Sequence, residues 1–134
     1  MTDSYDDLQA SYGRCLRQGH FIERFYRRFM DSHPDIPPLF AGTEFSRQNT
    51  ALRRGISSAI AHAAGSRLAE RTMLAMAQVH GSRGRAPVPP GLYPYWVDSL
   101  VAAVAETDPE FTPRLGLRWR QAMETTTAFF IGHH

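Results

Sequence analysis

Apolar residues recur along most of the chain at the spacing of an α-helix. Phe21, Phe25 and Phe29 stand at positions i, i+4 and i+8, and charged residues occupy most of the opposite side of the same stretch. This spacing places apolar side chains on one helix face and leaves the other face to solvent. No stretch shows the sustained period-two alternation that is typical of a half-buried strand. We therefore predict an all-α protein.

Prolines, glycines and capping residues divide this pattern into six or seven helices. We expect helices over residues 5–18, 20–32, from Thr43 or Ser46 to about 64, and over 68–81, 92–106 and 112–131. Pro34, Pro37 and Pro38 stop the second helix and predict an extended or single-turn segment. Thr43 or Ser46 is expected to cap the third helix. A length of 134 residues suits a single domain over residues 1–134.

The helix faces also predict which side chains are buried. In the first helix the expected core positions are Leu8, Tyr12, Cys15 and Leu16. Within the proline segment they are Ile36, Leu39 and Phe40, and in the next helix they are Phe45, Leu52, Ile56, Ala59 and Ala63.

A few polar residues interrupt these apolar faces. His80 shares a face with Met73, Gln48 falls on the face of Leu52, and Tyr26 stands at the edge of its apolar stripe. A polar group in such a place either bonds a structural partner or points into a pocket. A histidine at a helix C-terminus is also favoured by the helix dipole. Both readings stay open from the pattern alone.

The composition argues against several classes of protein. The formal charge is +2, and the 15 basic residues, all arginines, are scattered, without the dense basic block that favours a nucleic-acid partner. No apolar run approaches the roughly 18 residues of a membrane span, and the N-terminus lacks the basic start and apolar core of a signal peptide. We expect a cytoplasmic protein. Cys15 is the single cysteine, so neither an internal disulfide nor a thiolate metal cluster is expected.

The distribution of histidines narrows the choice of cofactor. Spacings such as Cys-x-x-Cys, Glu-x-x-His and His-Glu-x-x-His are absent. A lone histidine holds a bare metal ion poorly. It holds the iron of a porphyrin well, because the macrocycle supplies the equatorial nitrogens and apolar burial supplies much of the affinity. His80 is therefore a candidate haem ligand, held between facing helices.

Several segments, in the same order along the chain, resemble those of bacterial globins, namely the single-domain haemoglobins and the globin half of flavohaemoglobins. Phe25-Tyr26-Arg27-Arg28-Phe29 and His33-Pro34-Asp35-Ile36-Pro37-Pro38-Leu39-Phe40 resemble their second and third helices, and Gln48-Asn49-Thr50-Ala51-Leu52 resembles the start of their distal helix. His80 falls where the proximal ligand belongs, and Tyr93-Pro94 matches the pair that opens the next helix. The resemblance runs roughly from Tyr12 to the C-terminus. It implies a globin-like fold of six to eight helices enclosing haem b.

The resemblance also implies a role for each matching residue. His80 ligates the iron, and its other ring nitrogen donates to a backbone carbonyl or another acceptor. Tyr26 and Gln48 face the sixth coordination position, where phenol and amide donors would slow the release of O2. Arg83 or Arg85 pairs with a haem propionate. The remaining cofactor contacts are Leu39, Phe40, Leu52, Tyr93 and Trp96.

Other roles are compatible with some of these residues. Phe40, Leu52 and Trp96 would look the same as ordinary core residues, and Tyr26 could donate to a backbone carbonyl. His62 is expected to lie at the surface or between helices, and it is the first alternative ligand if His80 is not the ligand.

Two departures from the flavohaemoglobin pattern concern the proximal side. The segment between His80 and Tyr93 is longer, and His134 stands where that family carries a glutamate that polarises the proximal histidine. The Gly-x-Gly-x-x-Gly motif is absent, so a flavin- or nicotinamide-binding domain is not expected.

The resemblance implies reversible binding of a diatomic gas, most of all O2, with NO and CO as further ligands. Storage, delivery and scavenging of O2 are the first expectation. An alternative is a nitric oxide dioxygenase that draws electrons from an external reductase. A gas or redox sensor acting through a partner protein, and a haem-free structural globin, are the others.

Overall fold

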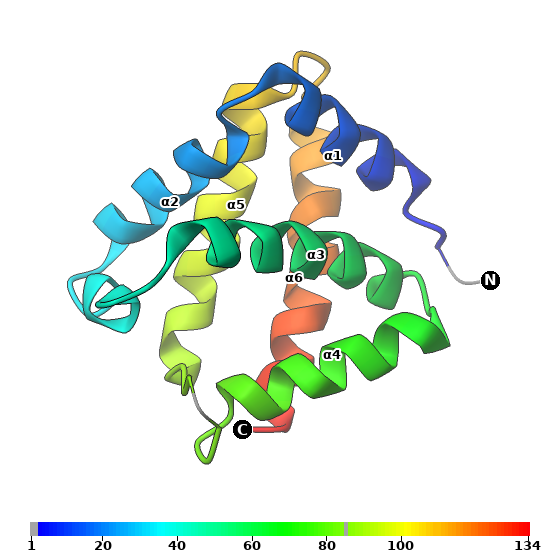
Figure 1. The fold of residues 1–134 in the computed structure, drawn as a ribbon. Helices are drawn as coiled ribbons and strands as arrows, with labels where there is room; N and C mark the ends of the chain where they lie inside the picture. Colours follow the sequence, from blue (N-terminus) through cyan, green and yellow to red (C-terminus); the bar gives the residue numbers. More distant parts are fainter. Residues whose placement is uncertain (1–2, 85) are drawn as a thin grey trace.

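The computed structural model describes residues 3–84 and 86–134, which contain helices and no strand. The prediction of an all-α fold is confirmed (Figure 1). The elements, in chain order, are α1 (Asp6–Gln18), α2 (Phe21–Ser32), the 3-10 helix η1 (Pro37–Phe40), α3 (Phe45–Ala63), α4 (Arg67–His80), the 3-10 helix η2 (Pro90–Leu92), α5 (Tyr93–Thr107) and α6 (Pro113–Gly132).

The helices pack in crossed pairs rather than in a parallel bundle. Figure 1 shows α2 lying along α5, and α3 crossing α6 with α4 running below it. The chain ends beside the C-terminal end of α4, where the backbone N–H of Ser82 donates to the carbonyl of His134 at 3.1 Å. None of the described helices is both long and apolar enough to span a lipid bilayer.

Side-chain caps explain where several helices begin. Ser66 accepts from the N–H of Ala69 at the start of α4, and Thr112 does the same for Leu115 in α6. The expected cap of α3 was wrong. Glu44, rather than Thr43 or Ser46, accepts from the first free N–H groups of this helix, because α3 begins at Phe45 and Ser46 already lies in its first turn.

The core follows the predicted helix faces, with exceptions at helix ends. Trp119, Phe21 and Phe25 are the largest fully buried side chains. Three residues expected to be inside are exposed: Leu16 by 37%, Leu39 by 41% and Phe45 by 41%. Each lies in the first or last turn of its helix, or in η1, where fewer neighbouring elements remain to cover it.

Two buried ionisable side chains, the thiol of Cys15 and the carboxyl of Asp108, differ in the charge they carry at neutral pH. Cys15 has no exposed surface, and burial raises the pKa of its thiol to about 12. Burial also opposes ionisation of the Asp108 carboxyl, but hydrogen bonds from Arg14, Ser11 and the N–H of Glu110 outweigh it and lower its pKa to about 2. This carboxylate therefore ties α1 to the corner between α5 and α6.

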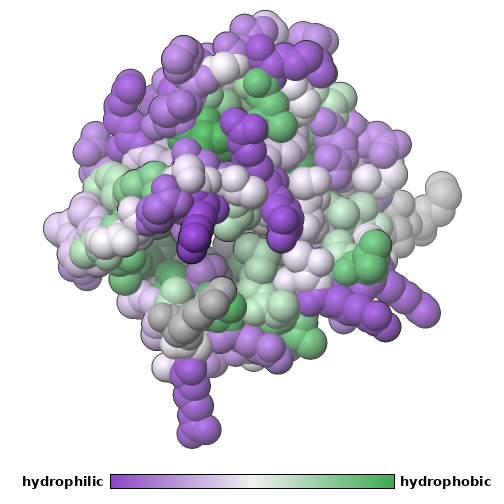
Figure 2. Space-filling model, viewed as in Figure 1, coloured by the Kyte–Doolittle hydropathy of each residue, from purple (hydrophilic) through white to green (hydrophobic). Residues whose placement is uncertain are grey.

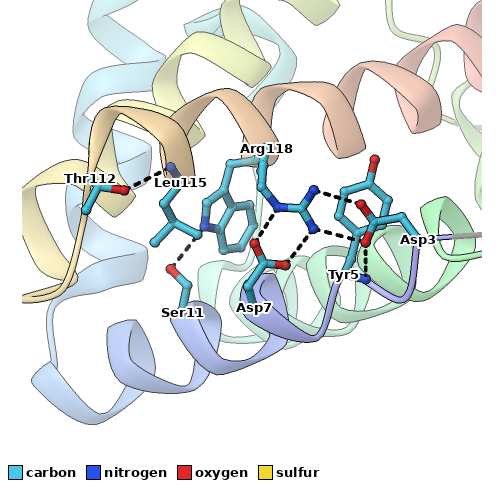
Figure 3. A network of polar contacts seen from close by, with 8 residues as sticks. Asp3, Tyr5, Asp7, Ser11, Thr112, Leu115 and Arg118 are labelled. Atoms are coloured by element: carbon cyan, nitrogen blue, oxygen red, sulfur yellow. Dashed lines mark hydrogen bonds and ion pairs between the residues drawn. The ribbon is translucent and has the colours of Figure 1, made fainter.

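A second polar network fastens the N-terminal segment to α6 (Figure 3). The Arg118 guanidinium donates to Asp3 at 2.7 Å and to Asp7 at 2.8 Å, and it lies over the ring of Tyr5 at 4.9 Å. A fork with two carboxylates and an aromatic ring is the geometry that arginine favours.

Candidate functional site

The molecular surface has a hollow between two of the helices that carry predicted site residues. Figure 2, viewed as Figure 1, shows this hollow between the first half of α3 and the C-terminal end of α4. Tyr26, Phe40 and Gln48 belong to α2, η1 and α3, whereas His80 is the last residue of α4 and Tyr93 the first of α5.

Tyr26 is the most unusual polar residue on the α3 side. Its side chain is buried, and its hydroxyl has no hydrogen-bond partner among the described residues. Burial raises the pKa of Tyr26 to about 12, and the nearby Gln48 side chain acts in the opposite direction. Gln48 thus lies close to the hydroxyl without meeting it in hydrogen-bond geometry. Donation from the Tyr26 hydroxyl to a backbone carbonyl, its possible structural role, is not found among residues 3–84 and 86–134.

Aromatic rings enclose Tyr26. Its ring centroid lies 5.2 Å from that of Phe25, 5.8 Å from that of Phe40 and 5.5 Å from that of Phe45, all with the edge of one ring toward the face of the other. Phe40 and Phe45 stack on each other at 6.2 Å. From the sequence, Phe45 was expected only as a core residue. Its position three residues before Gln48, on the same helix face, was the signal that could have placed it beside Tyr26.

Asn49 carries a second buried polar atom without a partner. Its side-chain oxygen is enclosed and receives no hydrogen bond in the described part of the chain. Sequence reasoning used Gln48 and passed over its neighbour, because the position of Asn49 falls off the apolar face that marked Gln48.

His80 makes one specific contact on the α4 side. Its Nδ1 lies 3.1 Å from the backbone oxygen of Ala86. A carbonyl only accepts, so this bond assigns the proton to Nδ1 and leaves the lone pair on Nε2. The ring of Phe130 lies 6.2 Å from the imidazole and 5.9 Å from Tyr93, so these three residues form one cluster. Burial raises the pKa of Tyr93 to about 12.

The other predicted residues are spread more widely. Trp96 packs against Phe25 at 6.0 Å, in the contact between α5 and α2. Leu52 is buried in the core, and Leu39 is exposed on η1. Arg83 is exposed at a recess that also includes Ser82 and His134. The predicted role of Arg85 falls outside the described residues.

His62 lies between helices, one of the two places expected for it. Its ring contacts Phe129 of α6 at 4.9 Å, and its Nδ1 is 3.5 Å from the Thr126 hydroxyl. Burial lowers its pKa, with Glu70 acting in the opposite direction. No group of three or more metal-ligating side chains occurs among residues 3–84 and 86–134.

Comparison with known proteins places these residues in a family. No protein-family model and no curated protein matches the chain. Among solved structures it is similar to protein PA3967 of Pseudomonas aeruginosa PAO1, whose crystal structure is described as structurally highly homologous to a human haemoglobin. The two chains are 31% identical, the match covers 98% of each, and the TM-score is 0.91. From this likeness over nearly the whole length of both chains, the protein belongs to the bacterial single-domain globins.

Proposed function

We propose that the protein is a haem-binding globin that takes up a diatomic gas reversibly, O2 above all, with haem b as cofactor and His80 as its iron ligand. The observation that carries this proposal is the Tyr26 hydroxyl, which is buried beside the rings of Phe40 and Phe45 and has no hydrogen-bond partner among the described residues. An unsatisfied buried donor costs about 1–3 kcal/mol. A ligand that accepts from this hydroxyl explains why the chain keeps it.

The predicted donor residues fit a haem better than a bare metal ion. Three metal-ligating side chains do not gather in the described residues. One imidazole is enough for a haem, because the porphyrin supplies the equatorial ligands. The bond between His80 Nδ1 and the Ala86 carbonyl leaves Nε2 as the basic nitrogen that iron requires.

Each residue then has a definite task. The haem iron, when bound, supplies a coordination site for a diatomic gas. His80 holds this cofactor from the α4 side, and the ring of Phe40 offers it an apolar face. Tyr26 presents an O–H group and Gln48 an N–H group to the gas pocket, while Leu52 limits its size. Arg83 or Arg85 is assigned to a propionate by charge.

An absorption spectrum of the purified chain with added hemin tests the proposal. We expect a Soret band that shifts after reduction with dithionite and again after addition of CO. In His80→Gly, hemin affinity should fall by roughly a hundredfold or more, since changes to residues behind a ligand already cost about 10- to 100-fold. Added imidazole should restore the band by filling the cavity.

His62→Ala is the matched control, because His62 is the other half-buried histidine that borders α6. It should bind hemin as the wild-type chain does. Undiminished hemin binding in His80→Gly without imidazole would reject His80 as the ligand. The absence of a Soret band in the wild-type chain would reject the function.

A further inference from the structure

The segment that follows α4 folds back onto the end of this helix. We call residues 81–84 and 86–88 the capping segment. Its Ala86 N–H donates to the carbonyl of Val79 at 3.1 Å, and its Val88 N–H donates to the carbonyl of His80 at 3.0 Å. The last carbonyls of an α-helix have no partner within the helix. The capping segment therefore supplies two of the donors that the end of α4 needs.

Prolines select the donors that make these bonds. Pro87 and Pro89 have no N–H, so the backbone donors from Ala86 to Pro89 are those of Ala86 and Val88 alone, and both bond the helix end. A proline also restricts the residue before it to extended conformations. Pro87 thereby limits the directions in which the Ala86 carbonyl can point.

A glycine allows the capping segment to lie this close to α4. A Cβ atom on Gly84 would stand 2.1 Å from the Val79 oxygen and 2.2 Å from the Gln78 oxygen, which no side chain tolerates. Ser82 fixes the start of the segment, because its N–H and its hydroxyl donate to the His134 carbonyl at 3.1 and 2.8 Å. The segment is thus held to α4 and to the end of α6.

One further bond gives the capping segment a role at the site: the Ala86 carbonyl accepts from His80 Nδ1 at 3.1 Å. A neutral histidine side chain in water favours the other tautomer, with its proton on Nε2. We propose that the capping segment positions His80, with Pro87 and Gly84 holding the Ala86 carbonyl on Nδ1 so that Nε2 keeps its lone pair free to bind a ligand. This inference rests on the proposed function, since a ligating His80 is what needs Nε2 free.

The tautomer of His80 tests the inference directly. Nitrogen-15 NMR of the full chain without added hemin separates protonated from unprotonated ring nitrogens. In the wild-type chain the Nδ1–H tautomer should predominate. In Pro87→Gly its ratio to the Nε2–H tautomer should fall by roughly fivefold, the effect of weakening one neutral hydrogen bond. Pro87→Ala should lie between the two, because alanine restores part of the backbone restriction.

Pro109→Gly is the matched control, since Pro109 is an exposed proline in the turn between α5 and α6. It should leave the tautomer unchanged. Gly84→Ala should shift the tautomer in the same direction as Pro87→Gly. If it does not keep its helical circular dichroism, the two Pro87 variants decide the matter.

A second readout uses the chain loaded with hemin and reduced. The iron–histidine stretching frequency depends on the hydrogen bond at Nδ1, so it should fall in Pro87→Gly and stay constant in Pro109→Gly. Wild-type tautomer ratios in both Pro87 variants would overturn the inference while leaving the proposed function standing. Failure of the wild-type chain to bind hemin would instead overturn the proposed function.

Discussion

Tyr26 illustrates how a single residue can be poor for stability and useful for binding. Its hydroxyl is buried and has no hydrogen-bond partner in the described part of the chain. The hydroxyl of Tyr12, equally buried, donates to the backbone oxygen of Arg53 at 2.9 Å. Folding alone favours the second arrangement. Conflicts of this kind between a local rule and the observed structure are expected at functional sites.

Replacing each tyrosine by phenylalanine should therefore give opposite results. In Tyr26→Phe the free energy of unfolding of the haem-free chain should rise by about 1 kcal/mol, because an unsatisfied donor is removed. In Tyr12→Phe it should fall by about 1 kcal/mol, because a hydrogen bond is lost. Urea denaturation measures both.

The same pair of variants should differ in gas binding. O2 dissociation should become roughly tenfold faster in Tyr26→Phe, the factor that corresponds to one hydrogen bond to a ligand. It should not change in Tyr12→Phe. Equal dissociation rates in Tyr26→Phe and the wild-type chain, measured by stopped flow, would contradict the distal role of Tyr26.

At the scale of elements, the joint between α1 and the α5–α6 corner depends on Asp108. Its carboxylate accepts from Ser11 at 2.6 Å and from Arg14 at 2.7 Å, and Ser11 in turn accepts from the indole of Trp119 at 3.0 Å. The Asp108 side chain has no exposed surface. Removing this acceptor leaves its donors unpaired in the interior.

Asp108→Ala should destabilise the protein by about 2 kcal/mol at pH 7. Because folding lowers the pKa of Asp108 from 3.8 to about 2, its contribution is present above pH 4 and is lost as the pH falls through 2. The difference between variant and wild type in urea denaturation should shrink over that window. Asp98→Ala, which removes an exposed pair with Arg120, should cost at most about 0.5 kcal/mol.

The elements themselves were largely predictable from the sequence. Apolar periodicity located the helices because burial on one face selects the residue type at each turn. The cap of α3 was not predictable in the same way, since Thr43, Glu44 and Ser46 all carry oxygens that can accept, and the backbone decides among them.

The site was predictable in part. A polar residue on an apolar face pointed to Tyr26, Gln48 and His80, and the family resemblance supplied their proposed roles. The Ala86 contact could not be found this way, because backbone groups in a loop leave no periodic signal. The place of Phe45 was also missed: exposure at a helix start depends on neighbouring elements that a single helix face does not describe.

For the whole molecule, the buried tyrosines predict that the free energy of unfolding falls at alkaline pH. Burial raises the pKa of Tyr12, Tyr26 and Tyr93 from the ordinary value of 10.0 to about 12. The folded chain therefore holds protons that the unfolded chain releases between pH 10 and 12. The free energy of unfolding should fall over this window by about 1.4 kcal/mol per pH unit for each tyrosine.

Urea denaturation at pH 9, 10 and 11, with tyrosinate absorbance at each step, measures this decline. Tyr93→Phe should flatten the slope between pH 10 and 11 by about one quarter, since the buried thiol of Cys15, with a pKa of about 12, contributes alongside the three tyrosines. A stability that stays constant from pH 9 to 11 would show that these hydroxyls ionise freely in the folded chain.

Because Cys15, the chain's one cysteine, is buried, the rate at which a thiol reagent labels it reports local unfolding. A thiol reagent attacks the thiolate, which is scarce at neutral pH for a group with a pKa of about 12, and it must first reach the inner face of α1. The labelling rate thus counts how often α1 leaves the core. Since α1 carries none of the proposed cofactor contacts, hemin can lower this labelling rate only by stabilising the folded chain as a whole. The factor should rise with hemin concentration.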